Sequence, residues 1–357
     1  MTSASHASND NGGSRDDLRP DHAIATRAEH DVRALAQAFE HAAQRVRHQR
    51  AGGATGAPVS DPDAVHDLRV AIRRLIAALG LWRPVLKTSA RRSATRALRT
   101  IRVAFGPVRE LEVHATRARA HLRQSCAAAA EHAAIAALER SLRQRYPRVR
   151  SDALATVSSR RVRDISQDVT RAFEDLRNRW EKPRRRARVA DRLKDARANA
   201  LKAIGAACEP GLSTEAEEFH RARIAIKKWR YVTERAAQAT GATDVPIERL
   251  RELQSALGHA RDAITFAGEI ARFVARSKPR QTALASVSAA LHAKAQEQAE
   301  HFLDQVAGFE ASVKPKPPAA PGAKAKARSS RPKRTATRGS ARPDTLSSRK
   351  PSSRAAG

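Results

Sequence analysis

The sequence predicts an all-α protein, and three observations lead to this prediction. Hydrophobic residues make up 41% of the 357 residues but aromatic residues only 4%. The core must therefore be built from Ala, Leu, Val and Ile, which suit helices better than sheets. Between residues 21 and 312, apolar residues recur at steps of three and four, the spacing of one helix face. No alternating pattern typical of a strand extends beyond a few residues.

Glycine and proline divide this region into helical segments. The first segment carries an apolar face made of Val32, Leu35, Ala36 and Phe39. Breaks are then expected, in chain order, at residues 52–62, 80–84, 106–107, 183, 210–211 and 241–246. The clearest helix starts are Asp61-Pro62 and residues 213–217, which offer capping side chains.

Both ends of the chain differ from this helical region. The first 21 residues are polar and have no apolar stretch of the kind found in signal peptides, so we expect a disordered leader. Residues 313–357 are rich in Pro, Ala, Ser and Lys and lack apolar periodicity, so we expect a disordered tail. Residues 22–312 are the predicted folded domain.

Positive charge is the strongest feature of the composition. The chain has 68 Lys and Arg against 37 Asp and Glu, a formal net charge of +31. From Lys314 onward there are thirteen basic residues and one acid, Asp344, which leaves 55 basic and 36 acidic residues upstream. The folded region is therefore basic in its own right and is expected to bind polyanions with release of counterions. The tail is either a second polyanion-binding element or a solubilising extension.

Other features disfavour several classes of protein. No run of about 18 uncharged apolar residues is present, so we expect no membrane insertion. Two cysteines, Cys126 and Cys208, cannot frame a disulfide-rich fold, and neither has a metal-ligating neighbour in sequence. We expect a cytoplasmic protein with no metal site and no cofactor.

The most informative feature is an internal duplication. The segment VHDLRVAIRRLIAALGLW, which begins at Val65, matches FHRARIAIKKWRYVTERA, which begins at Phe219, at an offset of 154 residues. Downstream, LRTIRVAFGPVRELEV from Leu98 matches LRELQSALGHARDAIT from Leu250 at an offset of 152. We therefore expect two related halves, at about residues 22–182 and 187–312.

Each matched helix carries basic residues along one flank. At 100° per residue, Leu68, Ile72 and Leu75 share a core-facing arc, and a basic stripe lies beside it. The stripes of the first matched pair are His66, Arg69 and Arg73, and His220, Arg223 and Lys227, the latter extended by Arg230 and Tyr231. Those of the second pair are Arg99, Arg102, Gly106 and Arg109, and Arg251, Gln254, Gly258 and Arg261. The glycine within each of these last two rows leaves room for a close approach to the backbone.

These stripes contain few acids. Like charges on neighbouring helical turns are unfavourable by roughly a few tenths of a kcal/mol per pair, and only Asp67 and Glu110 lie nearby in sequence. A solvated helix face would explain one such stripe. Four stripes in two matched pairs instead favour a surface for a long anion with regularly spaced phosphates. Arg offers forked donors to such a ligand, Lys a point charge, and His a charge that nearby phosphate favours.

The sequence resembles the CHAD domain, the conserved histidine α-helical domain. The resemblance rests on HDLRVAIRRL at His66 to Leu75 and HRARIAIKKWRY at His220 to Tyr231, supported by LQSALG and Arg261-Asp262. It covers roughly residues 22–312. It implies two related bundles, mostly of four helices each, with a basic groove between them. It also implies binding of inorganic polyphosphate and, in bacteria, association with polyphosphate granules.

The resemblance also implies a set of ligand-facing residues. Carried over by position, the set is His66, Arg69, Arg73, Arg74, Arg99, Arg109, His220, Arg223, Lys227, Lys228, Arg230, Tyr231, Arg251 and Arg261; Arg102 joins it on helical geometry alone. The sequence departs from the family pattern at Ile76, where another Arg is common, and at Glu110, where Asp is usual. The first half also lacks an Arg-Tyr pair, so binding is expected to depend more on the second half.

Three other functions compete with polyphosphate binding. An enzyme is disfavoured, because no E-x-E-x-K strand motif, Walker-type loop, H-E-x-x-H or G-x-S-x-G motif is present, and we expect no catalytic residues. The main alternative is a histone-like protein that binds DNA or RNA through its basic body and tail. Against this alternative, the aromatic residues of the sequence are too scattered to form a platform for stacking bases, and Trp82 and Trp229 are expected to pack in the core. The third is a scaffold that docks other granule proteins on its helix faces.

Overall fold

The chain is helical wherever the structure describes it. The computed structural model describes residues 20–48, 61, 63–124, 128–243, 245–275 and 277–313. Within those ranges the regular elements are eleven α-helices and one 3-10 turn, and none of these residues forms a strand. The all-α prediction is confirmed. The predicted leader and tail lie outside these ranges, apart from residues 20, 21 and 313, which are helical.

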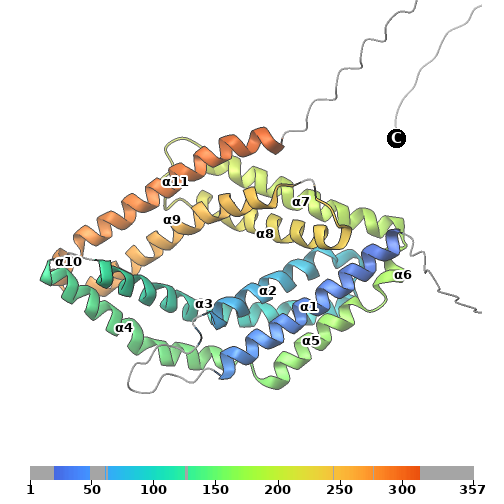
Figure 1. Cartoon of the computed structure of the whole chain (residues 1–357), viewed down its shortest axis with the longest axis horizontal. Helices are drawn as coiled ribbons and strands as arrows, with labels where there is room; N and C mark the ends of the chain where they lie inside the picture. The colour runs from blue at the N-terminus through green and yellow to red at the C-terminus, as the bar shows by residue number, and fades with distance from the viewer. Residues whose placement is uncertain are drawn as a thin grey trace, which may run out of the picture. The chain divides into compact units, whose positions relative to one another are not determined.

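The first half of the chain forms six of these helices. They are α1 (Pro20–His48), α2 (Ala64–Leu81), α3 (Thr88–Gln124), α4 (Ala129–Leu154), α5 (Ser159–Phe173) and α6 (Leu176–Trp180), with the 3-10 turn η1 (Arg83–Val85) between α2 and α3. Helix α1 packs against α2 and α5, and α3 packs against α2, α4 and α5. Figure 1 shows these helices in blue to green.

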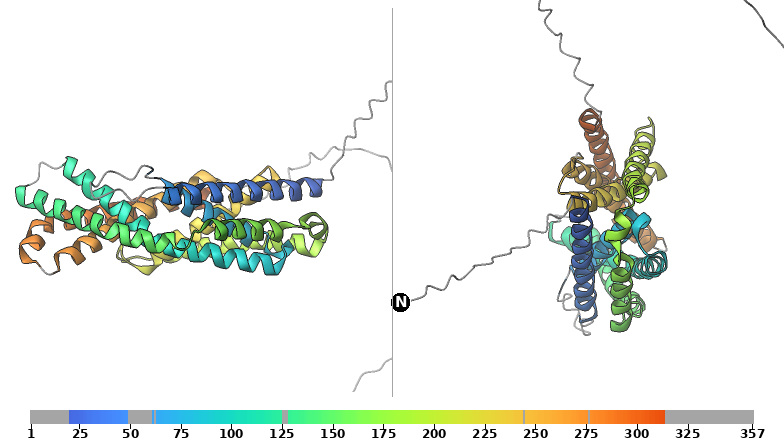
Figure 2. Two further views of the ribbon diagram at one scale, coloured as in Figure 1. Left: turned by 90° about the horizontal axis from the view of Figure 1, so that it is seen from below. Right: turned by 90° about the vertical axis from the view of Figure 1, so that its right-hand side faces the viewer.

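The second half forms the remaining five helices. They are α7 (Pro183–Ala207), α8 (Glu217–Thr240), α9 (Ile247–Val274), α10 (Lys278–Ala283) and α11 (Ala285–Val313). Helix α8 lies between α7 and α9, and α9 packs along α11. Seen from below, most of the long helices extend roughly along the horizontal axis of the view (Figure 2, left). None of the helices along the described ranges is long and apolar enough to span a bilayer.

Most helix boundaries fall at the predicted breaks. Helix α2 ends at Leu81, α7 begins at Pro183, and α8 is followed by Gly241, whose φ of 78° is the left-handed conformation that a glycine adopts readily. The predicted caps are less accurate. Helix α8 begins at Glu217 with no side-chain cap. Asp61, an expected cap, pairs with Arg45 of α1 at 2.6 Å.

The break predicted at residues 106–107 is wrong, because α3 continues through Gly106 and Pro107 to Gln124. A proline inside a helix costs about 3 kcal/mol, since it removes one backbone hydrogen bond and its ring crowds the preceding turn. On both sides of this proline the apolar face of α3 is fully buried, at Ile101, Phe105 and Val108. Burying each such side chain contributes about 1.5 to 3 kcal/mol, so packing outweighs the proline.

One hydrophobic core joins the two halves. Leu68 and Ile72 of α2 and Ile226 and Trp229 of α8 are fully buried in the same cluster. Helix α8 also packs directly against α1 and α2. Because the apolar faces of α2 and α8 share one core, the basic flanks beside those faces are brought together.

Candidate functional site

The basic stripes of α2 and α8 converge where the two halves pack. The ammonium group of Lys227 lies within electrostatic range of Arg69 and Arg73 on α2 and of Arg223 on its own helix. Arg73 is also within range of Arg223. We call Arg69, Arg73, Arg223 and Lys227 the central cluster. Each half contributes two of its members, so the cluster requires both halves to be folded together.

The glycines in the rows on α3 and α9 lie beside arginines of this cluster. A β-carbon added at Gly106 would lie 3.8 Å from Nη1 of Arg69, and one added at Gly258 would lie 3.9 Å from Nε of Arg223. Arg69 also donates a hydrogen bond of 2.9 Å to the backbone carbonyl of Arg102. The space predicted beside these glycines is therefore next to a guanidinium, in the same way in both halves.

Tyr231 links the two halves inside the site. Its hydroxyl on α8 is hydrogen-bonded to the guanidinium of Arg73 on α2. The ring also lies 4.4 Å from the guanidinium carbon of Arg230, in a cation–π contact. Tyr231 is buried, so it holds Arg73 through its hydroxyl and offers no exposed ring to a ligand.

The acids that the sequence places near the stripes do not pair with the central cluster. Asp67, one residue after His66, turns to α1 and accepts a hydrogen bond of 2.6 Å from Arg45. The charge of Glu110 raises the pKa of Arg69, and that of Asp262 raises the pKa of Arg223, but neither carboxylate forms an ion pair with its arginine. Asp262 instead lies 3.6 Å from Arg117 of α3.

Burial and mutual repulsion lower the pKa values of the cluster. Burial first, and then Arg73 and Arg223, lower the pKa of Lys227 from 10.5 to about 7. Burial and the charge of Arg73 lower the pKa of Arg69 to about 10, well below that of an ordinary arginine. Burial also lowers the pKa values of Arg73 and Arg223. The charged forms of these side chains are therefore destabilised in the free protein, where water is partly excluded. A bound anion would stabilise them.

Other residues of the predicted set surround the central cluster. Arg102 and Arg109 on α3 are within electrostatic range of Arg69 and Arg73, and Arg261 on α9 is within range of Arg223. His66 is exposed, yet partial desolvation and the charge of Arg109 lower its pKa. Arg109 itself lies 3.4 Å from Glu112. The side chains of Arg99 and Lys228 are exposed.

Three residues of the predicted set are engaged elsewhere. Arg230 is buried and pairs with Glu234 at 2.7 Å, and Arg251 is held by Glu248 and by Glu234. Arg74 is exposed, and its positive charge stabilises the ionised form of Asp31 on α1. Arg230, whose pairing with Tyr231 was expected to favour the second half, is thus neutralised by a carboxylate. Glu234 stands four residues after Arg230, an i, i+4 spacing from which this pairing could have been inferred.

His220 lies beside a small cavity at the start of α8. The cavity, of about 20 Å³, is also lined by Thr214, Arg223 and Arg261. The Nδ1 atom of His220 and the Nε atom of Arg223 are buried with no hydrogen-bond partner among the described residues. A space of this size holds a single water molecule, which could satisfy both atoms.

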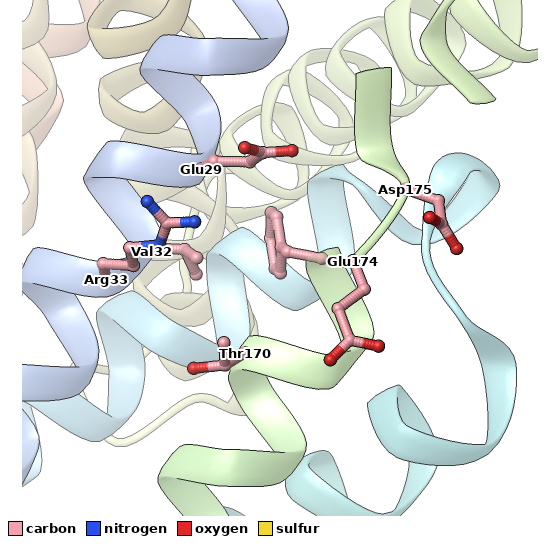
Figure 3. A pocket seen from close by; sticks show the side chains of 7 residues that line it. Glu29, Val32, Arg33, Thr170, Glu174 and Asp175 are labelled. Carbon is pink, nitrogen blue, oxygen red and sulfur yellow. The ribbon is translucent and has the colours of Figure 1, made fainter. Parts of the chain in front are cut away.

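The larger cavities lie between α1 and α5, and none of the predicted ligand-facing residues lines them. One of about 240 Å³ is lined by Glu29, Arg33, Glu174 and Asp175, and Figure 3 shows its three carboxylates and single guanidinium. Glu174 and Asp175 already pair with Lys87, at 2.7 and 3.3 Å. With more acids than bases, this cavity is unsuited to an anion.

Comparison with known proteins identifies the family. The model of the CHAD domain matches residues 33–271. PptA from Streptomyces chartreusis has the same fold, with a TM-score of 0.53 and 21% identity over 81% of this chain and 98% of that chain. The crystal structure of the CHAD domain from the plant Ricinus communis gives a TM-score of 0.55 and 16% identity, over 81% and 92%. None of the curated proteins matches in sequence. Since the family model covers well over half of the sequence, the chain belongs to the CHAD domain family.

Proposed function

We propose that this chain binds inorganic polyphosphate at the central cluster and that it is not an enzyme. One observation carries the proposal: four cations, two from each half, converge without an ion pair to any carboxylate in the described part of the chain. Bringing such charges together costs stability unless a ligand neutralises them. The arrangement is therefore expected of a site that is completed by an anion.

The chemistry of the cluster suits a chain of phosphates. Guanidinium groups donate paired hydrogen bonds to phosphate oxygens, and a lysine supplies a point charge that adjusts to the position of the next phosphate. Arg102 and Arg261 extend the positive surface around the four cations, whereas Arg109 is paired with Glu112. Such side chains hold phosphate through charge and hydrogen bonds, which supports binding without catalysis.

Membership of the CHAD family supports a polyphosphate-related role, and the burial of aromatic side chains weakens the nucleic-acid alternative. Trp82, Trp180 and Trp229 have 3%, 8% and 0% of their surface exposed. Stacking on unpaired bases requires aromatic faces that the ligand can reach. We further propose that the protein works in the cytoplasm, on polyphosphate granules, and that any binding of DNA or RNA depends on the basic tail.

Competition on the full chain tests the proposal. Long-chain polyphosphate and duplex DNA would compete for the fluorescently labelled protein at physiological ionic strength, with the wild type and a variant carrying Ala at the four positions of the central cluster. We expect polyphosphate to bind the wild type far more tightly than DNA does, and the variant to lose most of this preference. A matched control replaces four exposed arginines outside the cluster, Arg140, Arg160, Arg163 and Arg177, by Ala.

The control separates site binding from net charge, because both variants lose four positive charges. Equal displacement by DNA and polyphosphate from the wild type would favour the nucleic-acid alternative. Equal losses in the two variants would show that the chain binds polyanions by total charge alone. Circular dichroism should show unchanged helicity in both, since the four cations flank the core rather than fill it.

A further inference from the structure

A second group of arginines, without ion pairs to other described residues, lies around the start of α3. Arg91 on α3 is within electrostatic range of Arg83 of η1, Arg92 of α3 and Arg192 of α7, and no carboxylate of the described residues acts on it. We call Arg83, Arg91, Arg92 and Arg192 the distal cluster. They come from three separate elements, and α7 packs against η1.

The inner part of this cluster has unused hydrogen-bonding atoms. The Nε atom of Arg91 and the hydroxyl of Thr95, one turn later on α3, are buried with no partner among the described residues. Arg91 and Arg192 are half-buried, whereas Arg83 and Arg92 are exposed. The group is thus open to solvent on one side and lined by donors on the other, as an anion site requires.

None of the four arginines forms an ion pair with a carboxylate in the described part of the chain, and this includes Asp191 and Asp195, which flank Arg192 on α7. Glu174 and Asp175, the acids next to η1 and α3, pair with Lys87. Arg185 of α7 uses its guanidinium on the carbonyl of Pro84, at 3.4 Å, which holds the start of α7 against η1. That contact holds α7 against η1, two of the elements that carry the distal cluster, and it uses none of the four arginines of the cluster.

Helix α3 connects the distal cluster to the central one. At 100° per residue, Arg91, Arg102 and Arg109 fall within about 20° of one another on the same side of the helix. Arg102 and Arg109 lie within electrostatic range of Arg69 and Arg73. Arg91 and Arg102 are separated by eleven residues, which is about 16 Å along the helix axis. Arginines of both clusters therefore share one side of α3, with Thr95 and the buried Leu98 lying between Arg91 and Arg102 on that side.

We propose that the distal cluster is a second phosphate-binding site, occupied by the far end of a polyphosphate chain already bound at the central cluster. This inference rests on the proposed function and adds a selectivity for length. A short chain fills the central cluster only, whereas a long chain reaches both and gains affinity because the second contact is intramolecular.

The experiment compares chain lengths in a double variant, Arg91→Gln with Arg192→Gln. Calorimetric titration of the full chain would use tripolyphosphate and long-chain polyphosphate. We expect tripolyphosphate to bind the variant within about two-fold of the wild type, and long chains to bind roughly 10- to 100-fold more weakly. The control is Arg160→Gln with Arg163→Gln, two exposed arginines of α5 with the same change in charge. The pair Arg91→Lys with Arg192→Lys should keep most of the long-chain affinity.

Each outcome bears on the inference separately from the proposed function. Long-chain affinity equal to the wild type, or a loss equal to that of the α5 control, would overturn the distal site while polyphosphate binding stands. An equal loss of affinity for tripolyphosphate and for long chains would show that the distal cluster does not distinguish chains by length, and would overturn the inference. If the wild type binds neither probe, the proposed function itself fails. Thermal unfolding should show the variant at least as stable as the wild type, because it removes like-charge repulsion.

Discussion

Replacing Lys227 with arginine removes a group that titrates near neutrality and keeps a positive charge in its place. In the free protein the pKa of Lys227 is about 7, against 10.5 for an ordinary lysine, because the amine is buried among Arg73, Arg223, Arg230 and Arg69. A bound phosphate chain supplies negative charge and restores the ammonium form, so the pKa rises again in the complex. Binding above pH 7 is therefore expected to take up close to one proton.

The size of the effect follows from linkage. One proton taken up lowers the affinity by up to about ten-fold for each pH unit above the free pKa, or up to about a hundred-fold from pH 7 to pH 9. Below pH 7, Lys227 is charged in both states and contributes no further pH dependence. The sign for folding is opposite: between pH 7 and 10.5 the unfolded chain holds a proton that folded Lys227 has released, so the free energy of unfolding rises with pH.

Calorimetric titration with long-chain polyphosphate, in buffers of different ionisation enthalpy, measures both the affinity and the protons taken up. The wild type should take up close to one proton more than Lys227→Arg at about pH 8 and should lose affinity more steeply toward pH 9. Titration of the ligand is common to both proteins and cancels in the comparison. Identical pH profiles for the two proteins would refute the assignment of Lys227 to the binding site.

Two further predictions concern residues around the central cluster. Glu234→Gln leaves the buried Arg230 without its anion and should lower the free energy of unfolding in urea by about 3 kcal/mol; unchanged stability with tighter polyphosphate binding would return Arg230 and Arg251 to the ligand set. Gly258→Ala meets Arg223 only at ordinary contact distance, so it should keep polyphosphate affinity and raise stability by roughly 0.5 to 1 kcal/mol, whereas a large loss of affinity would mean that the ligand occupies this space.

The fold was largely predictable because its signals are local. Apolar spacing placed Leu68 and Ile72 in the core, and glycine and proline marked most helix ends. The break predicted at Gly106-Pro107 failed because the burial of Phe105 and its neighbours depends on helices that are distant in sequence. Local propensity does not report how well a proline-containing helix packs.

The site was predictable only in part. Helical geometry put Arg69 and Arg73 on one stripe and Arg223 and Lys227 on its copy, and the duplication indicated that the stripes act together. Spacing cannot tell which arginine finds a carboxylate in the folded protein, and Asp67 turned to Arg45 in α1, twenty-two residues away. The distal cluster was missed because Arg83, Arg91 and Arg192 lie on three elements and form no pattern along the chain.

An arginine lies beside a glycine once in each half, Arg69 by Gly106 and Arg223 by Gly258. This repetition affects the direction in which a ligand can enter the site. A linear inorganic phosphate chain has no polarity, and it looks alike from its two ends. A nucleic acid strand, in contrast, has a 5′ and a 3′ end. An unbranched phosphate chain that enters this site with either end first therefore meets the same pair of contacts, and reversal of the chain costs it nothing.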